Sequence, residues 1–328
     1  MIKDSFKKFV KNENSKKPIF TPGPSSLLAE NILGLKPCFG RGDIDYQKTE
    51  NEVLKEIKIL AGQKNIIRMQ GSASLAIEVS IKNFISGRVL LIDSGYYSDR
   101  LKFILNNERE IDKNIKIDYV NYFELENLKD FSYDWVVACY VETSKGFRHS
   151  ISKIKKFVDK AGAKLFLDAT ASIGLEENHH LADLLAFSSC KGLFGLTGAC
   201  FITFNDLKTK PINSFYLDIN THLEKKMTGP YHQICSLDLV LRNYTFYKQA
   251  VLNTKRSFME RFSEFAIYPL ENQPFLCTYV SKKITSKKEN VVLYSSRANT
   301  SGSIICHLGE VHLGNLANGK INKLIEIG

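Results

Sequence analysis

Seven short segments rich in apolar residues, separated by stretches with helical spacing, lie between residues 65 and 204 and constrain the fold more than any other feature. Each segment has the length of a buried strand, and the stretches between them repeat apolar residues every three to four positions. This alternation predicts an α/β fold in which helices cover both faces of a mostly parallel central sheet. The expected strands are residues 65–69, 88–93, 115–120, 134–141, 164–168, 184–188 and 199–204, and the expected helices are residues 45–60, 73–85, 97–106 and 150–161.

The pattern changes towards both ends of the chain. The first residues are rich in lysine, and a long helical stretch, residues 233–262, precedes apolar runs at residues 275–280 and 291–294. A helix followed by separate strands predicts a smaller α+β unit. The expected organisation is an exposed amphipathic arm over residues 1–17, a large domain over residues 18–235 and a small C-terminal domain over residues 236–328.

Composition argues against several classes of protein. The 328 residues are 44% apolar and 24% charged, as in soluble globular proteins. No apolar stretch approaches the ~20 residues of a membrane-spanning helix, and the N-terminus lacks an apolar signal core, so we expect a cytoplasmic protein without membrane contact. The net charge is +10, but the lysines are spread along the chain without a nucleic-acid-binding motif, which favours a solvated surface. Seven cysteines without a C-x-x-C pair argue against disulfides and against a metal site.

Two of the predicted strands end at or shortly before residues that could take part in a reaction. Asp168 ends the strand at residues 164–168, and Lys191 closely follows the strand at residues 184–188. Ligands of parallel sheets collect at the carboxyl ends of strands. Pyridoxal phosphate (PLP) requires an amine that forms a Schiff base and a carboxylate beside its pyridine nitrogen. The pair predicts a PLP site, although many α/β proteins end strands with an aspartate and a lysine.

A phosphate-binding segment would support that prediction. Gly71, Ser72, Ala73 and Ser74 follow a predicted strand and open a predicted helix. Glycine allows close backbone approach, and the amides of a helix N-terminus attract an anion. The alternative is an ordinary serine N-cap, which is the commoner role of an isolated Gly-Ser pair.

Several segments, taken in order, resemble the class V aminotransferase family of fold-type I PLP enzymes. Within this family they are most similar to the 2-aminoethylphosphonate–pyruvate transaminase branch. The resemblance is good over residues 18–240 and poor beyond them, and it implies the fold-type I architecture with PLP bound by the large domain. The matching segments are residues 21–24, 70–78, 95–100, 142–146, 168–172, 188–192, 228–232 and 308–311.

The resemblance implies a role for each matching residue. Lys191 would carry the cofactor and move the substrate proton, and Asp168 would keep the pyridine nitrogen protonated. Tyr97 would stack on the ring, with Tyr96 as the alternative if the register slips by one position. The other implied cofactor contacts are Gly71, Ser72, Ala73, Ser74 and Ser188 at the phosphate, Thr143 near the ring hydroxyl, and Thr228 reaching the phosphate from a neighbouring subunit. A homodimer with the site at its interface follows from the last of these.

The sequence also departs from the family pattern. The family arginine that binds the substrate anion corresponds to Ile304, which cannot bind one, and Arg297 is the nearest candidate replacement. Cys190 stands before the lysine, where relatives carry an amide or another polar side chain and cysteine desulfurases carry a histidine. The cofactor is therefore predicted more firmly than the substrate.

Three functions remain open at this point. The first is a PLP-dependent aminotransferase of phosphonate metabolism, which exchanges an amino group between a small amine, with 2-aminoethylphosphonate as a candidate, and an α-keto acid such as pyruvate. The second is another PLP reaction on the same scaffold, such as a lyase or elimination reaction. The third is a non-catalytic relative that binds an anionic ligand, a partner subunit or nucleic acid. The retention of Asp168 and Lys191 argues against the third.

Overall fold

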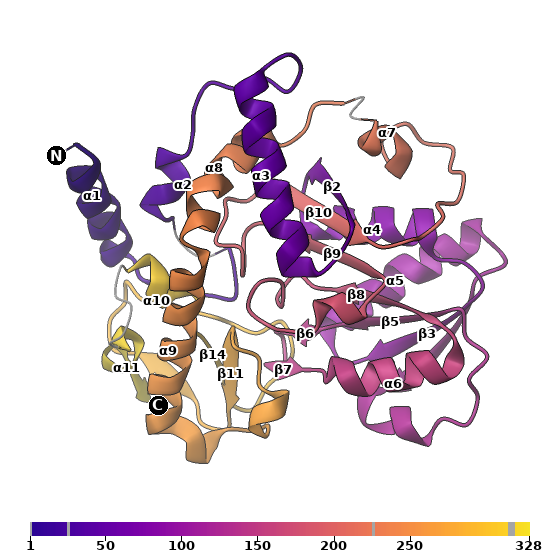
Figure 1. Ribbon diagram of the computed structural model, residues 1–328. Helices are drawn as coiled ribbons and strands as arrows, with labels where there is room; N and C mark the ends of the chain where they lie inside the picture. The colour runs from indigo at the N-terminus through magenta and orange to yellow at the C-terminus, as the bar shows by residue number, and fades with distance from the viewer. Residues whose placement is uncertain (1, 25–26, 225–226, 314–318) are drawn as a thin grey trace.

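A seven-stranded sheet forms the centre of the structure, a computed structural model that describes residues 2–24, 27–224, 227–313 and 319–328 (Figure 1). β10 is antiparallel to its neighbours β2 and β9, and the other neighbouring strands pair in parallel. The predicted mostly parallel sheet is thus confirmed. In spatial order the strands are β2 (Asn65–Gln70), β10 (Ala199–Phe204), β9 (Leu184–Ser188), β8 (Lys164–Asp168), β5 (Trp135–Cys139), β3 (Arg88–Asp93) and β4 (Lys116–Asn121).

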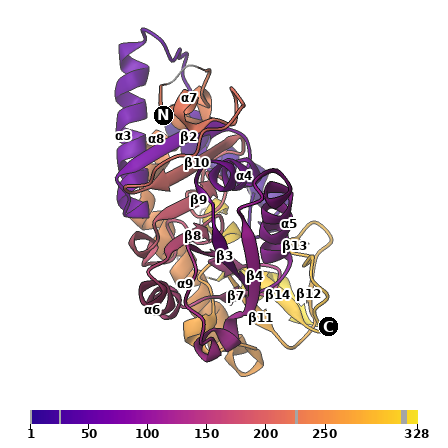
Figure 2. The same cartoon turned by 90° about the vertical axis from the view of Figure 1, so that its right-hand side faces the viewer.

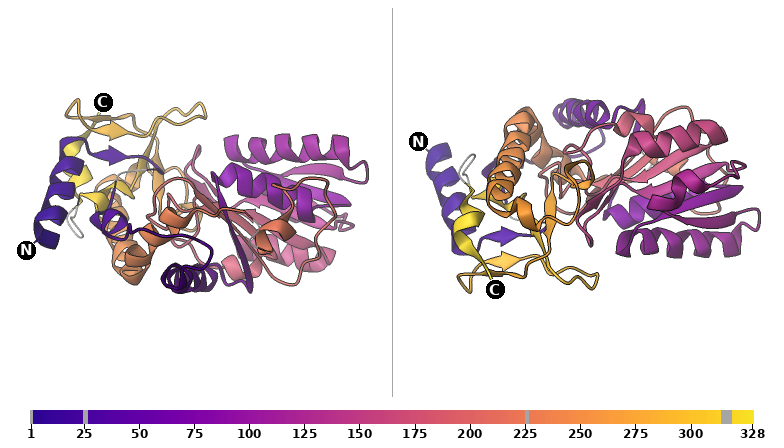
Figure 3. Two further views of the ribbon diagram at one scale, coloured as in Figure 1. Left: turned by 90° about the horizontal axis from the view of Figure 1, so that it is seen from above. Right: turned by 90° about the horizontal axis from the view of Figure 1, so that it is seen from below.

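Helices cover both faces of this sheet, as the alternating pattern predicts (Figures 2 and 3). Successive side chains of a strand point to opposite faces, so Val136 and Val137 of β5 belong to two different hydrophobic cores. Burial on both faces explains why the strands read as continuous apolar runs. The helices over the core of Val137 are α4 (Ala73–Phe84) and α5 (Tyr96–Ile111), and those over the core of Val136 are α3 (Ile44–Ala61) and α6 (Ile151–Ala161).

Two helical predictions need correction. Helix α5 continues to Ile111, beyond the predicted end at residue 106, because buried Leu105 and Glu108 extend its inward face. The predicted stretch at residues 233–262 is two helices rather than one. Asn243 has φ −110° and ψ 15° and separates α8 (Tyr231–Arg242) from α9 (Tyr244–Phe262).

The C-terminal part carries small separate sheets. β11 (Cys277–Val280) pairs with β14 (Ser303–Cys306), and β12 (Ile284–Ser286) pairs with β15 (Ile325–Ile327). β1 (Ile19–Phe20) joins this part by pairing in parallel with β13 (Val292–Leu293), and Phe20 lies in the same core as Phe258. Residues near the N-terminus thus complete the core of the C-terminal part. The domain boundaries at residues 17 and 235 stay a prediction. The remaining elements are α1 (Ile2–Lys16), α2 (Ala29–Leu33), β6 (Val141–Glu142), β7 (Phe147–Arg148), α7 (Ile219–Leu223), α10 (Gly309–His312) and α11 (Lys320–Leu324).

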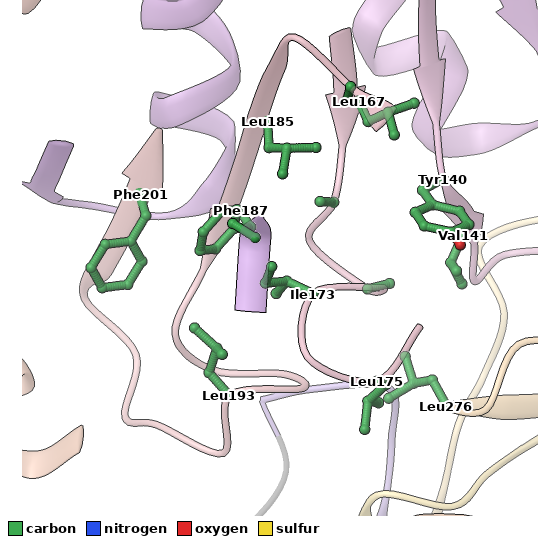
Figure 4. Close-up of a cluster of buried hydrophobic side chains, with 14 of the residues drawn as sticks. Tyr140, Val141, Leu167, Ile173, Leu175, Leu185, Phe187, Leu193, Phe201 and Leu276 are labelled. Carbon is green, nitrogen blue, oxygen red and sulfur yellow. The ribbon is translucent and has the colours of Figure 1, made fainter. Parts of the chain in front are cut away.

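The segments that follow β8 and β9 are anchored in the core. Ile173 and Leu175, after β8, pack near Leu193, after β9, and Leu276 joins them from the C-terminal part (Figure 4). All four side chains are buried. This packing fixes the two loops that leave the carboxyl ends of the strands. Among the described residues, no helix is both long and apolar enough to cross a membrane.

Candidate active site

A cavity of about 300 Å³ lies at the carboxyl ends of the central strands, where parallel sheets bind ligands. Asp168 ends β8, Lys191 follows β9, and both side chains line the cavity. Because β8 and β9 are neighbouring parallel strands, their ends meet at one edge of the sheet. The other predicted site residues that line the cavity are Ser72, Ala73, Ser74, Tyr97, Thr143, Ser188 and Arg297.

The carboxylate of Asp168 is buried and has several hydrogen-bond donors. Its Oδ1 accepts from the backbone nitrogen of Thr170 at 3.0 Å and from the Thr170 hydroxyl. Its Oδ2 accepts from Nη2 of Arg100 at 2.7 Å, which makes an ion pair. Burial acts to lower the pKa of Arg100, but Asp168, with smaller contributions from Cys139 and Tyr97, raises it above its usual value. The buried negative charge therefore has a fixed counter-charge, as such groups require.

Lys191 lies in a loop whose backbone is held on both sides. The nitrogen of Ser189 donates to the carbonyl of Ala199 at 3.1 Å, and the nitrogen of Phe194 donates to the carbonyl of Lys191 at 2.9 Å. Only 8% of the Lys191 surface is exposed, and its Nζ lies 5.4 Å from the ring centroid of Tyr97. The structure thus places a shielded amine beside an aromatic ring in the cavity wall, where an aldehyde ligand could be captured.

The turn at residues 21–24 packs against the stem of this lysine. Gly23 has φ +117°, a conformation that favours glycine. A Cβ atom at this position would lie 2.6 Å from Cγ of Lys191 and 2.7 Å from the carbonyl oxygen of Cys190. These distances are too short for real contacts, so the position of Lys191 depends on the glycine.

Replacing Gly23 with alanine is expected to displace Lys191 and to slow covalent capture of PLP by about 10²-fold, because a small misplacement of a reacting group has a large effect on rate. The rate is measured from the absorbance change when PLP is added to the ligand-free protein. The matched control is Gly162→Ala. Gly162 also has a positive φ, of +63°, but a Cβ there meets nothing within 4 Å. Equal capture rates in the two variants would contradict the prediction.

The N-terminus of α4 opens onto the same cavity. The helix begins at Ala73 after the N-cap Ser72, whose hydroxyl makes no capping hydrogen bond. Unpaired amides at a helix start and the helix dipole favour an anion. The unused hydroxyl favours the phosphate-binding interpretation over the ordinary serine cap. Ser188 lies on the same cavity wall, with its Oγ 3.5 Å from Sγ of Cys190.

Glu142 supports the aromatic wall of the cavity. Its buried carboxylate accepts from the backbone nitrogens of Tyr97 at 3.0 Å and Ser98 at 3.3 Å, and also from Ser144. Burial raises the pKa of Glu142, and these hydrogen bonds oppose that effect without cancelling it. The carboxylate thus joins the end of β6 to the start of α5 and fixes the backbone that carries Tyr97.

The cavity wall also has a polar atom without a partner. Thr143 is fully buried, and its Oγ1 has no hydrogen-bond partner of standard geometry in the described part of the chain. Buried polar atoms are nearly always paired. The hydroxyl therefore marks a point where a ligand that fills the cavity would form a hydrogen bond.

Some predicted residues lie outside the cavity wall. Gly71 immediately precedes the helix start and donates from its nitrogen to the carbonyl of Gly198 at 3.1 Å. Thr228 is exposed, and its carbonyl accepts from Nε2 of Gln70 at 3.3 Å, beside the same strand end. Tyr96 is 40% exposed, whereas Tyr97 lines the cavity. The geometry therefore favours Tyr97 over Tyr96 as the residue that would stack on the ring.

Sequence reasoning gave no role to Arg100, Thr170 or Glu142. Arg100 follows Tyr97 by three positions on a predicted helix, and this spacing puts both side chains on one face. That spacing was a usable signal. The contact of Thr170 is local, because Asp168 accepts from a residue two positions on, as in an Asx-turn. The contacts of Glu142 with Tyr97 and Ser98 had no comparable signal, because they depend on how two distant segments meet.

This chain is similar to several known aminotransferases. The 2-aminoethylphosphonate–pyruvate transaminase of Pseudomonas aeruginosa is 25% identical over 253 residues, which cover 69% of this chain and 67% of the relative. The enzyme of the same name from Rhizobium meliloti is 28% identical over 170 residues, 48% of this chain and 44% of the relative. The crystal structure of pyridoxamine–pyruvate aminotransferase from Mesorhizobium loti superposes with a TM-score of 0.75, at 19% identity over 93% of this chain and 92% of that one. This chain is a homologue of the class V aminotransferases and has their fold-type I architecture.

Other solved aminotransferases share the fold of this homologue. Ureidoglycine–glyoxylate aminotransferase from Bacillus subtilis gives a TM-score of 0.73 at 18% identity, over 90% of each chain. No protein-family model matches the sequence. The predicted fold class and the predicted relationship are both confirmed.

The two residues that the sequence singles out for the substrate anion lie in different surroundings. Ile304 lies in β14 and is buried, with 2% of its surface exposed. Arg297 lines the cavity, and its Nη1 donates to the hydroxyl of Tyr96 at 3.0 Å. This hydrogen bond is the main cause of the raised pKa of Arg297. Arg297 is thus an exposed cation in the cavity wall, where it could bind an anion.

Proposed function

We propose that this protein is a PLP-dependent aminotransferase that moves an amino group between a small amine and an α-keto acid. One observation carries the proposal. Buried Asp168 and shielded Lys191, from adjacent parallel strands, line one cavity together with the N-terminus of α4. This cavity offers a carboxylate, an amine and an anion site, and PLP has a ring nitrogen, an aldehyde and a phosphate to match them. The names of the homologues support the same activity.

The residues present fit the cofactor. Lys191 would hold it covalently, and Asp168 would bind its ring nitrogen. The hydroxyl of Thr143, which has no hydrogen-bond partner of standard geometry among the described residues, would bind a ring substituent. The phosphate would lie at the start of α4, with Ser188 beside it. When bound, PLP supplies an aldehyde that captures the substrate amine and a ring that accepts the electron pair released at the substrate carbon.

The chain's own residues would then direct the reaction. Lys191 Nζ would take a proton from the substrate carbon and return it to the cofactor side, which requires the amine to stay on one wall of the cavity. The fixed loop around Lys191 provides that position. Tyr97, whose backbone is held by Glu142, would keep the ring in place. Burial of this wall would limit the access of water to the reacting atoms.

The direct test uses one half of the reaction. Purified protein loaded with PLP is mixed with 2-aminoethylphosphonate alone, and the products are separated by chromatography. An aminotransferase yields pyridoxamine phosphate and an aldehyde in equal amounts, and added pyruvate restores PLP. Release of the phosphorus group or of ammonia without pyridoxamine phosphate would indicate an elimination or lyase reaction. Protein that takes up no PLP would refute the proposal.

We propose Arg297 as the cation that binds the substrate anion. Replacing it with alanine is expected to raise KM for the anionic substrate by roughly 10- to 100-fold with a smaller change in kcat, because a hydrogen bond to a charged group contributes about 1.5–3 kcal/mol. Steady-state kinetics with each substrate measure the effect. The control is Arg109→Ala, which removes an arginine with 43% of its side chain exposed that pairs with Glu110 at 3.9 Å. An unchanged KM in Arg297→Ala would assign the anion to another group.

A homodimer is part of the proposal, on the basis of the resemblance. Thr228 is exposed beside the strand end that leads into α4. In a dimer of the expected kind it would reach the phosphate bound by the neighbouring subunit. Sedimentation velocity with and without PLP measures the state, and a monomer that binds PLP with full activity would contradict the dimer.

A further inference from the structure

Arg100 joins the two ends of the candidate site. It lies one turn after Tyr97 on α5, and its guanidinium carbon lies 5.1 Å from the Tyr97 ring centroid. Nη2 donates to Asp168 at 2.7 Å, and Nη1 donates to Oγ of Ser74 at 3.1 Å. Its Nε is buried without a hydrogen-bond partner in the described residues. One planar side chain therefore connects the carboxylate to the helix start that favours an anion.

The carboxylate of Asp168 has little acceptor capacity left. A carboxylate offers about four positions for hydrogen-bond donors. Thr170 occupies two on Oδ1, and Arg100 occupies one on Oδ2. A ring nitrogen held by Asp168 would take the remaining position and would share Oδ2 with Arg100.

This sharing has an electrostatic consequence. Asp168 favours a proton on the ring nitrogen, whereas a permanent positive charge close by disfavours one. An arginine keeps its charge at every accessible pH. The other titratable side chains that line this cavity are Tyr97, Cys139, Cys190, Lys191 and Arg297. Burial raises the pKa of the Cys139 thiol well above its usual range, so that it stays neutral near pH 7. Two permanent positive charges line the cavity, Arg100 and Arg297. Arg100 is the one that donates directly to Asp168, whereas Arg297 donates to the hydroxyl of Tyr96, so Arg100 is the charge that opposes the effect of Asp168.

We infer that Arg100 is a positioning residue that orients Asp168 and moderates the proton affinity of the cofactor's ring nitrogen. The inference rests on the proposed function. Without PLP, Arg100 supplies the counter-charge of the buried carboxylate. With PLP bound, it makes the ring nitrogen lose its proton more readily than it would beside Asp168 alone.

The test measures the ring nitrogen directly. Wild type, Arg100→Met, Arg100→Gln and Arg100→Lys are loaded with PLP labelled with nitrogen-15 at the ring, and the nitrogen chemical shift is followed against pH. Loss of the charge in the methionine and glutamine variants is expected to raise the proton affinity of the nitrogen by at least about tenfold, and the lysine variant is expected to stay within about threefold of wild type. Arg109→Met, which removes an exposed arginine from the same helix, is expected to leave the titration unchanged.

The possible failures can be told apart. Wild type that takes up no PLP would refute the proposed function before any variant is compared. Methionine and glutamine variants that bind PLP and titrate like wild type would overturn the inference and leave Arg100 a purely structural role. If Arg100→Met does not fold, Arg100→Gln makes the same comparison, since its amide can still donate to Asp168 or Ser74.

Discussion

Alanine in place of Lys191 is expected to abolish covalent capture of PLP and to lower kcat by about 10⁴-fold or more, because the proposed mechanism uses this one amine both as nucleophile and as proton carrier. Its position explains the size of the effect. Lys191 is 8% exposed and held beside Tyr97, with Nζ 5.4 Å from the ring centroid. Capture is measured by the visible absorbance of the bound cofactor and by mass spectrometry after borohydride reduction.

The control for this experiment is Lys64→Ala. Lys64 is exposed and pairs with Asp206 at 2.8 Å, at the start of β2, the opposite end of that strand from the candidate site. This variant is expected to keep both cofactor and activity. A borohydride-stable adduct that persists in Lys191→Ala would mean that another lysine carries the cofactor, and the account of the site would have to be abandoned.

Asparagine in place of Asp168 is expected to lower kcat by about 10³-fold, the usual scale for losing one preorganised charge in an active site. It is also expected to destabilise the ligand-free protein by about 2–3 kcal/mol. Removing one partner of a buried ion pair leaves the other charge uncompensated, and the effect is smaller here than for a fully buried pair because the Arg100 side chain keeps 25% exposure. The midpoint of urea denaturation and the affinity for PLP measure the two effects.

A matched ion pair elsewhere provides the control. Asp118 of β4 pairs with Arg88 at 2.7 Å, and their side chains are 45% and 32% exposed. Asp118→Asn is expected to change stability by less than about 1 kcal/mol, as for other exposed pairs, and to leave activity unchanged. Equal effects of the two substitutions would show that Asp168 has no special role.

Local pattern was enough to predict the sheet. A strand covered on both faces is apolar at every position, so β5, β8 and β9 appear in the sequence as short uninterrupted apolar runs. The same pattern placed Asp168 and Lys191 at strand ends, and parallel strands bring such ends to one edge. The helix break at Asn243 was missed, because asparagine is tolerated in helices and the apolar spacing continues on both sides.

The details of the site were harder to predict, because they depend on contacts between distant segments. Arg100 and Asp168 are 68 positions apart, and their ion pair depends on how α5 is placed relative to the carboxyl end of β8. Glu142 and Tyr97 are 45 positions apart and meet only because a loop and a helix start come together. Gly23 packs against Lys191 from the turn at residues 21–24, which lies far before Lys191 in the sequence.

The sequence by itself determined the α/β architecture and the pair of residues that any bound PLP would need, because periodic burial and strand-end chemistry are both local properties. The tertiary structure alone decided that Arg100 neutralises Asp168, that Tyr97 rather than Tyr96 lines the cavity, and that β1 completes the C-terminal core by pairing with β13. These outcomes depend on the relative placement of packed elements. Many long-range contacts fix that placement together, and no single segment of the chain encodes it.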